Sequence, residues 1–536
     1  MVESADASTS ATDEVRTIES PPRGTWDTLR RLGPGIIIAA SIVGSGELIA
    51  TTKTGAEAGF TLLWLIVLGC LIKVFVQIEF GRYTIAQGLT AMDGMNSVPG
   101  PRVGVNWLMW YWLVMFTLGL GQLGGIVGGV GQSMALTVPI TGDYRESVRQ
   151  SAAVRAVEAE PDVMVAEAVA EAEAGDQQAG THGDSAKREP AAANGVKHEV
   201  ASRTVDDTVW TSVITLVTIG LLVGGRYRMI QSVAAVLVAS FTAVTIFNIV
   251  ALQTYESWAI GWSDLVHGLS FRLPAAIGES RPVATALATF GIIGVGASEL
   301  IAYPYWCLEK GYARFTGPRS DDEAWAARAR GWMRVMRWDC WMSMAIYTFA
   351  TVAFYLLGAA VLFRQGLNPD KSEMIPVLAE MFGPVFGDWA NVLFLFGAVA
   401  VLYSTFFIAT AANTRMAADA MRVFGVLDAS ASAQGRWIRI FCVAFPLVSL
   451  LLYLWLPNPV TLVLISGLSQ TIMLPMLGGA ALFFRYRCCD RRITPSFAWD
   501  AMLALSVLGL FVLGIWGAIT GIPVAIERVG EMLLPG

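Results

Sequence analysis

The sequence predicts an all-α polytopic membrane protein with about 11 helices that cross a lipid bilayer. Three observations support this fold class. Of the 536 residues, 54% are hydrophobic and only 15% are charged, whereas about a quarter of the residues of a soluble protein are charged. The apolar residues gather in runs of about twenty, such as 60–80 and 345–363, which is the length of a spanning helix. Two distant spans also contain nearly the same short sequence motif, at residues 42–50 and 295–302, which indicates an internal repeat.

The positions of the apolar runs define the predicted elements. Residues 1–32 are polar and lack the apolar core of a signal peptide, so we expect a disordered cytoplasmic tail and no cleaved leader. Three spans lie within 33–140 and eight within 207–536, and a polar insertion at 141–206 separates them. The expected spans are 34–57, 60–81, 105–136, 208–225, 230–252, 284–308, 338–363, 388–411, 437–456, 459–484 and 497–520.

Lysine and arginine are distributed unevenly among the predicted loops. One alternate set of loops contains pairs such as Arg226 with Arg228 and Arg485 with Arg487, whereas the loop 455–460 of the other set has no cation. Cytoplasmic loops are enriched in these residues. We therefore expect a protein of the cell (inner) membrane with a cytoplasmic N-terminus and an outward C-terminus.

The insertion 141–206 differs in composition from the rest of the chain. It is rich in Ala, Glu, Asp, Gly and Ser and has no aromatic residue after Tyr144, so we expect it to be disordered. An inert, solvated extracytoplasmic segment is favoured over a cation-gathering one, and His182 and His198 within it are given no metal role. The six cysteines show no metal-ligand spacing, and no disulfide is expected.

The repeated motif places one glutamate beside a glycine-containing break in each of two spans. Glu47 lies in the stretch 42–50 and Glu299 in the stretch 295–302. A carboxylate at membrane depth is costly and is usually functional. Interrupted spans in corresponding halves of a chain indicate the binding site of a secondary transporter. The structural alternative is that each glutamate is protonated or caps a half-helix, and matched contexts favour function.

Two carboxylates together with unwound backbone carbonyls form an all-oxygen site. The expected ligands are Glu47 and Glu299, with Ser45, Ser298 and the carbonyls near Gly44 and Gly296 as auxiliary groups. Oxygen ligands suit Mg²⁺, Ca²⁺ or Mn²⁺ better than thiophilic metals. Two further charges are given structural roles. Lys73 is expected to extend toward the inner surface, and Asp339 to be interfacial.

Short motifs along the chain resemble those of the Nramp family of divalent metal transporters. They are Gly33-Pro34-Gly35, the stretches 55–60 and 62–64, Gly291 to Gly294, Tyr403 to Thr405, and Leu474-Pro475. The resemblance covers nearly all of the chain apart from the tail and the insertion. It implies a LeuT-type fold of two inverted five-helix repeats plus an eleventh helix, working by alternating access.

The residues at the family's metal site depart from its pattern. The Asp-Pro-Gly-Asn motif of the first helix is replaced by residues 44–47, and Met-Pro-His of the sixth helix by residues 298–300. The glutamine of the tenth helix falls at Met473, while Gln470 lies one turn earlier; Ser404 is a further auxiliary candidate. The third span has no charged residue between Val105 and Thr141. The resemblance thus implies harder ligands and a weakened proton route.

The leading functional hypothesis is a carrier of divalent cations that prefers hard metals, either passive or weakly proton-coupled. One alternative keeps the fold but moves a small organic cation or amine, since one fold hosts many cargoes. Another is a non-transporting membrane sensor. No enzyme activity and no cofactor are expected. The expected partners are the ion and the bilayer, with protons left open and no nucleic acid.

Overall fold

The computed structural model describes residues 18–153, 204–225, 227–274, 281–370, 373–428 and 430–533. Within these ranges, ten helices are long and apolar enough to cross a membrane, and Val236–Leu252 is a shorter apolar helix. These eleven elements agree with the predicted spans. The all-α class is confirmed, apart from a small hairpin of β1 (Arg102–Val103) and β2 (Val105–Asn106).

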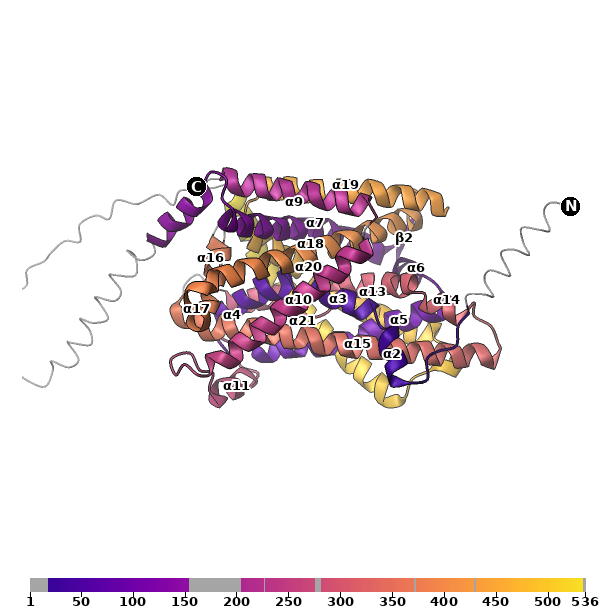
Figure 1. Cartoon of the computed structure of the whole chain (residues 1–536). Coiled ribbons are helices and arrows are strands. Elements are labelled where there is room, and N and C mark those ends of the chain that lie inside the picture. The colour runs from indigo at the N-terminus through magenta and orange to yellow at the C-terminus, as the bar shows by residue number, and fades with distance from the viewer. Residues whose placement is uncertain are drawn as a thin grey trace, which may run out of the picture.

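Helices make up most of the described chain (Figure 1). The first half contains α2 (Thr25–Arg31), α3 (Pro34–Ile42), η1 (Ser45–Thr51), α4 (Thr52–Ala58), α5 (Leu63–Gln87), α6 (Ala91–Ser97), α7 (Trp107–Thr137), α9 (Val205–Val223) and α10 (Tyr227–Leu252). The second half contains α11 (Trp262–Gly268), α12 (Pro282–Ile292), α13 (Ala297–Lys310), α14 (Tyr312–Thr316), α15 (Glu323–Leu357), η2 (Gly358–Leu362), η3 (Phe363–Gln365), α16 (Met374–Ala379), η5 (Glu380–Phe382), α17 (Gly383–Phe386), η6 (Gly387–Trp389) and α18 (Ala390–Val423). It ends with α19 (Ala431–Trp455), α20 (Pro459–Phe483), η7 (Phe484–Cys488), η8 (Arg491–Ile493) and α21 (Phe497–Leu533).

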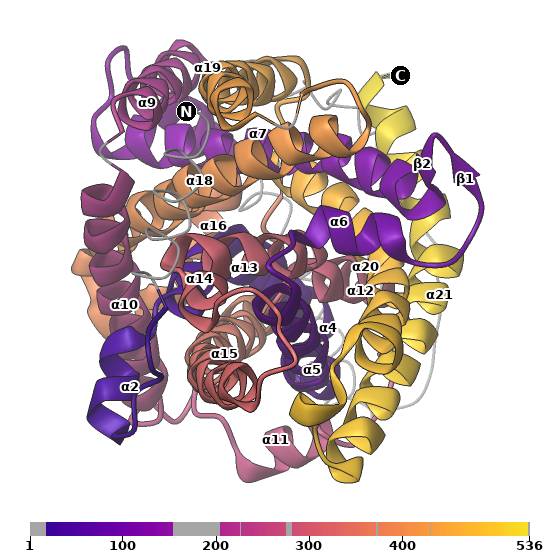
Figure 2. The ribbon, with the colours of Figure 1, turned by 90° about the vertical axis from the view of Figure 1, so that its right-hand side faces the viewer.

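Two spans are interrupted in the middle, as the repeated motif predicts. The first consists of α3, a break at Val43 and Gly44, and the π-helical η1 that continues into α4. The second consists of α12, a break over residues 293–296, and α13. Gly294 has φ +55° in this second break, a left-handed conformation that glycine adopts without steric cost. Both interrupted spans lie at the centre of the helix bundle, between α5, α15, α18 and α20 (Figure 2).

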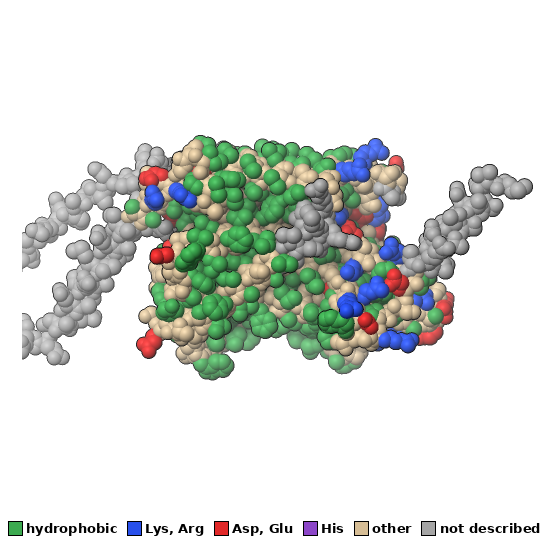
Figure 3. All heavy atoms as spheres, in the orientation of Figure 1, with side chains coloured by type: hydrophobic (Ala, Val, Ile, Leu, Met, Phe, Trp, Pro, Cys, Tyr) green, Lys and Arg blue, Asp and Glu red, His purple; other side chains and the backbone are tan. Residues whose placement is uncertain are grey.

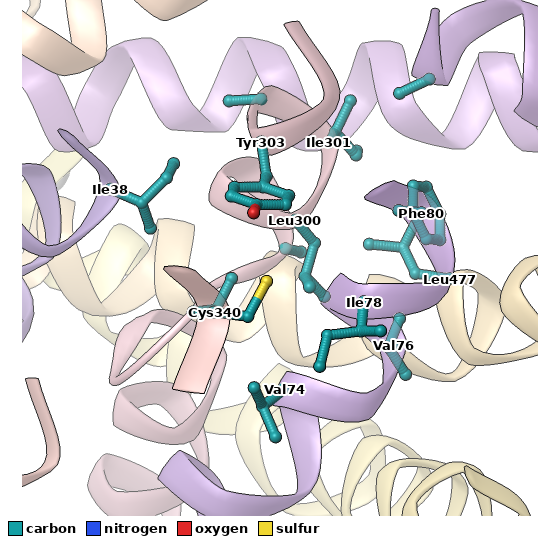
Figure 4. Packing of buried hydrophobic residues seen from close by; sticks show 14 of the residues in the cluster. Ile38, Val74, Val76, Ile78, Phe80, Leu300, Ile301, Tyr303, Cys340 and Leu477 are labelled. Atoms are coloured by element: carbon teal, nitrogen blue, oxygen red, sulfur yellow. The ribbon is translucent and has the colours of Figure 1, made fainter. Parts of the chain in front are cut away.

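The interior is packed with apolar side chains from helices that are distant in sequence. Ile78 of α5 lies beside Leu300 of α13, and Phe80 of α5 lies beside Leu477 of α20 (Figure 4). Each of these side chains is buried. Burial of a large aliphatic side chain stabilises by about 1.5–3 kcal/mol, so this packing fixes α13 and the break before it against α5.

The outer surface separates into an apolar belt and two charged ends. Figure 3 shows hydrophobic side chains around the middle, with most of the lysines and arginines on this face gathered at the end where Figure 1 labels α2 and α14. That end includes Arg319, Arg330 and Arg492. The distribution is the one that a bilayer-spanning protein shows.

Parts of the predicted tail and insertion are ordered, contrary to expectation. Residues 1–17 and 154–203 lie outside the described residues, but α2 forms within the tail and residues 143–153 are helical. Asp206 of α9 accepts hydrogen bonds from the backbone N–H groups of Thr141 and Gly142, the second at 2.9 Å. Trp332 donates to the Glu19 carbonyl at 3.0 Å. These tertiary contacts supply the stabilisation that the local composition lacks.

Two helices extend further than their predicted spans. α15 begins at Glu323 rather than near residue 338, and α18 ends at Val423 rather than near 411. Asp322 caps the start of α15 by accepting from the Ala324 N–H. The extra turns are polar and lie at the arginine-rich end of the molecule, so hydropathy could not assign them to a helix.

Candidate functional site

A cavity with about 620 Å³ of empty volume lies where the two interrupted spans meet. Its deep part is lined by Ser45 and Gly46 of η1, Gln122 of α7, and Ser298 and Glu299 of α13. Its other part follows the distal turns of α13 and α18, past the positions listed here: Ala302, Trp306, Ala412, Asn413 and Met416. Those turns lead toward α6 and α14 at the arginine-rich end (Figure 2), so the cavity extends toward that end.

The repeated motif gives the two glutamates equivalent positions on their half-helices. Gly44 precedes the first residue of η1 and Gly296 precedes the first residue of α13, and each glutamate is the third residue after its glycine. The N–H groups of a helix start have no helical partners and attract negative charge. Both carboxyl groups therefore sit at favourable helix ends, and they are close enough to interact electrostatically.

Glu299 is the glutamate that faces the cavity. Its side chain lines the cavity wall, and its Oε2 atom is buried without a hydrogen-bond partner among the described residues. Gly296 leaves room for this carboxylate, because a Cβ atom at Gly296 would lie 2.5 Å from Glu299 Oε2. A buried, unpartnered carboxylate oxygen is costly. It is therefore the strongest indication of a ligand in this part of the molecule.

Glu47 has a different environment from Glu299. It is fully buried, and its Oε1 atom accepts a 3.0 Å hydrogen bond from Thr351 of α15. Its Oε2 atom accepts from the Gly44 N–H at 3.4 Å. Glu47 is not among the residues that line the cavity. These contacts describe a half-helix cap, so the assignment of Glu47 as an ion ligand remains a prediction.

An uncharged network joins both interrupted spans to the third and tenth helices. Gln122 Nε2 donates to Ser45 Oγ at 3.1 Å, and Gln122 Oε1 accepts from Gln470 Nε2 at 2.9 Å. Gln122 Oε1 also accepts from Ser466 at 2.9 Å, and Gln470 Oε1 accepts from the Ser298 N–H at 3.1 Å. Gln470 thus contacts two residues of the cavity wall, and its role as an auxiliary ligand stays a prediction. Gln122 was missed, although an amide in an otherwise apolar span was a signal for it.

Close backbone approaches explain the glycines of the first break. A Cβ atom at Gly46 would lie 2.9 Å from the Ile292 carbonyl oxygen at the end of α12. At Gly44 it would lie 1.8 Å from Thr405 Oγ1, a buried atom with no partner among the described residues. The two breaks therefore meet through backbone atoms, and larger residues would push them apart.

Other auxiliary candidates lie outside the cavity wall. Met473 is fully buried in the hydrophobic core of α20. Ser404 donates to the Ala40 carbonyl at 3.2 Å near the end of α3, while its neighbour Thr405 lines the cavity. Gly44 and Gly296 shape the site without lining the cavity. In the described part of the chain, no cluster of three or more His, Cys, Asp or Glu residues could hold a metal.

Two charged residues are more deeply buried than the sequence predicted. Lys73 of α5 is fully buried and does not extend to the surface, because Nζ donates to the backbone carbonyls of Phe290 and Ile293. Asp339 of α15 is also buried and accepts from the Gly33 and Gly35 N–H groups at the start of α3. Each is held by backbone atoms of an interrupted span, which hydropathy alone cannot reveal.

Interrupted spans around a polar cavity define a polytopic helical membrane protein with the architecture of secondary transporters. A family model described as natural resistance-associated macrophage protein-like (Nramp) matches residues 199–522. The chain belongs to this family.

Individual relatives match over shorter stretches. The divalent metal cation transporter MntH of Levilactobacillus brevis is 31% identical over 121 residues, and MntH of Yersinia enterocolitica is 27% identical over 115 residues. These matches cover 22% and 21% of this chain and only 26% and 28% of the two relatives. A manganese transporter mutant from Eremococcus coleocola has a similar structure, with a TM-score of 0.58, 15% identity and 96% coverage of both chains. That likeness confirms the fold.

Proposed function

We propose that this protein transports divalent metal cations across the membrane by alternating access, with a preference for hard ions such as Mg²⁺ and Mn²⁺. The observation that carries the proposal is the carboxylate of Glu299, which faces a central cavity and has one oxygen without a hydrogen-bond partner in the described part of the chain. Membership of the Nramp family and the names of the MntH relatives support the metal cargo.

The chemistry of the cavity supports a hard ion. The deep part presents the Glu299 carboxylate, the hydroxyls of Ser45 and Ser298, and the amide of Gln122. These are oxygen donors of the kind that Mg²⁺ and Mn²⁺ prefer. The one thioether on the wall, Met416, belongs to a distal turn of α18. A hydrated or partly hydrated ion is the natural occupant of such a site.

The direction of the cavity supports an inward-open state. It extends toward the arginine-rich end, which we assign to the cytoplasm by the positive-inside rule. At the opposite end, Lys53 of α4 forms an ion pair with Glu57 at 3.1 Å and donates to Asn368 at 2.8 Å. This contact holds α4 against the loop after η3, as expected of an outer side that is closed. With this orientation the N-terminus would be cytoplasmic, in agreement with the distribution of lysine and arginine in the sequence.

Flux into proteoliposomes tests the proposed cargo. We expect the wild type to take up Mg²⁺ and Mn²⁺, the Glu299→Gln variant to take up neither, and internal pH to report any coupled protons. Glu309→Gln is the matched control, because Glu309 lies on the same helix with its side chain 46% exposed. Uptake of small amines but not of metals would refute the metal cargo, and normal metal flux in Glu299→Gln would refute the site.

Cysteine labelling tests the proposed direction of opening. In a background where Cys488 and Cys489 are replaced by serine, Asn413→Cys should react with a membrane-impermeant maleimide from the cytoplasmic side only. Ala398→Cys on the same helix is the control, because Ala398 is fully buried. Labelling of Asn413→Cys only from the outside would reverse the assigned orientation.

A further inference from the structure

Lys73 places an ammonium group at the end of the first half of the second interrupted span. Nζ donates to the carbonyl oxygens of Phe290 and Ile293, at 2.8 Å to the second, and lies 4.4 Å from the centroid of the Phe290 ring. The side chain is fully buried. A lysine is almost never fully buried without such partners, so these contacts are what keep it in place.

The carbonyls that Lys73 contacts are groups left free where α12 ends. The last carbonyls of a helix have no helical N–H partner, and the C-terminal end of the helix carries partial negative charge. In transporters built from interrupted spans, such carbonyls coordinate monovalent coupling ions. Here a side chain from the neighbouring helix α5 supplies the positive charge instead.

The ammonium also belongs electrostatically to the proposed ion site. Lys73 interacts with the carboxyl groups of both Glu299 and Glu47. The break that it caps leads within a few residues to Gly296, which shapes the space beside Glu299. Lys73 therefore fixes the backbone on one side of the cavity through the Phe290 and Ile293 carbonyls.

We propose that the Lys73 ammonium is a tethered cation that occupies a monovalent-ion position at the carbonyl end of α12. The proposal deepens the transport function above and rests on it for its functional consequence. Because the position is filled covalently, divalent flux needs no monovalent metal ion. Lys73 is a positioning residue, since it acts through the Phe290 and Ile293 carbonyls and not by contact with the transported ion.

Chemical rescue tests this assignment directly. The Lys73→Ala substitution deletes Cγ, Cδ, Cε and Nζ, which are the atoms of propylammonium. Lys73→Ala should unfold at a lower temperature than the wild type, and propylammonium should raise its Tm by about 2 °C or more. Tetramethylammonium, which has no N–H donor, and propan-1-ol, which has no charge, should not. Lys73→Met is the matched control, because its side chain fills the space and leaves no room for the amine.

The outcomes separate this proposal from the proposed cargo. Selective stabilisation of Lys73→Ala by propylammonium supports the tethered cation even if no metal flux is found. Equal effects of the three additives, or equal effects on Lys73→Ala and Lys73→Met, would overturn it. Recovery of folded Lys73→Ala only when propylammonium is present during purification would support it, and failure of recovery in every additive would overturn it.

Flux measurements test the functional consequence. Wild-type divalent flux should be unchanged when all Na⁺ and K⁺ are replaced by N-methylglucamine. Flux through Lys73→Ala should fall at least about tenfold, the equivalent of one charged hydrogen bond, and propylammonium should restore it. A requirement of the wild type for a monovalent metal ion would contradict the proposal.

Discussion

The buried cluster around Lys53 at the outer end of α4 allows a sharp test of how the outer side is closed. Lys53 Nζ lies 3.1 Å from Glu57 Oε1, 2.8 Å from Asn368 Oδ1 and 3.1 Å from the Pro369 carbonyl. The side chains of Lys53 and Glu57 are only 2% and 3% exposed. Glu57 Oε2 has no hydrogen-bond partner among the described residues. The pair therefore depends on very few contacts.

The Lys53→Met variant should be strongly destabilised. It removes the positive partner of Glu57 and leaves this carboxylate with one hydrogen bond, from Asn368 Nδ2 at 3.3 Å. Removal of one member of a buried ion pair costs about 3–5 kcal/mol because the other charge stays uncompensated. Glu57→Gln should cost less, about 2 kcal/mol, since the Asn368 and Pro369 oxygens still accept from Lys53.

The double variant Lys53→Met/Glu57→Gln is the decisive measurement. It leaves no buried orphan charge, since the other carboxylate near Lys53 Nζ, that of Asp370 at 3.8 Å, belongs to a side chain that is 49% exposed. Its loss of stability should therefore be about 2 kcal/mol, well below the sum of the two single losses. Reversible unfolding in mixed micelles, followed by tryptophan fluorescence, measures the three differences in free energy of unfolding. If the single losses add within about 0.5 kcal/mol, the two residues are not coupled and the reasoning is wrong.

Three further predictions concern the site and the arginine-rich end. Glu299→Gln should abolish metal flux and leave Tm unchanged, whereas Glu47→Gln should lower the free energy of unfolding by about 1–3 kcal/mol because it disrupts a satisfied cap; identical phenotypes would contradict the distinction. Gln122→Leu should raise the KM for the ion about tenfold with little change in kcat, because it removes the amide from the cavity wall together with its hydrogen bonds to Ser45, Ser466 and Gln470; an unchanged KM would exclude Gln122 from the site. The Arg492 guanidinium holds the pKa of the Asp490 carboxyl well below its usual range. The stabilisation lost in Asp490→Asn should therefore be constant above about pH 4, the pKa of an unfolded aspartate, and shrink as the pH falls toward the folded pKa. Paired Tm measurements from pH 8 to pH 3.5 check this, and a difference that already shrinks near pH 6 would refute it.

The fold was predictable because its determinants are local in the sequence. Span length and apolar composition identify the helices, and the repeated glycine-containing motif locates both interruptions. Glu299, Ser45 and Ser298 line one cavity, so the repeated motif also identified part of the cavity wall. Each of these features can be recognised within a window of about twenty residues.

What the sequence could not provide is the set of partners across the bundle. Glu47 and Glu299 lie in almost the same sequence motif, yet Glu47 accepts a hydrogen bond from Thr351 of α15, whereas one oxygen of Glu299 has no partner among the described residues. Gln122 reaches the site because α7 packs against α20, which carries Gln470. The sequence led us to expect that the Lys73 side chain reaches the membrane surface, because nothing in the sequence of α5 indicates that the carbonyl groups at the end of α12 lie beside it. Only tertiary packing distinguishes these cases.

The two interrupted spans therefore perform different tasks with the same local design. In the first, the glutamate is satisfied by a neighbouring helix, and the break is fixed by close packing of Gly44 against Thr405. In the second, the ammonium of Lys73 holds the carbonyl side of the break, while on the other side Glu299 Oε2 has no hydrogen-bond partner among the described residues. A binding site needs one flexible or unsatisfied partner held in a rigid frame. Division of the two requirements between matched halves provides both: the first span contributes rigidity, and the second contributes the carboxylate available to an ion.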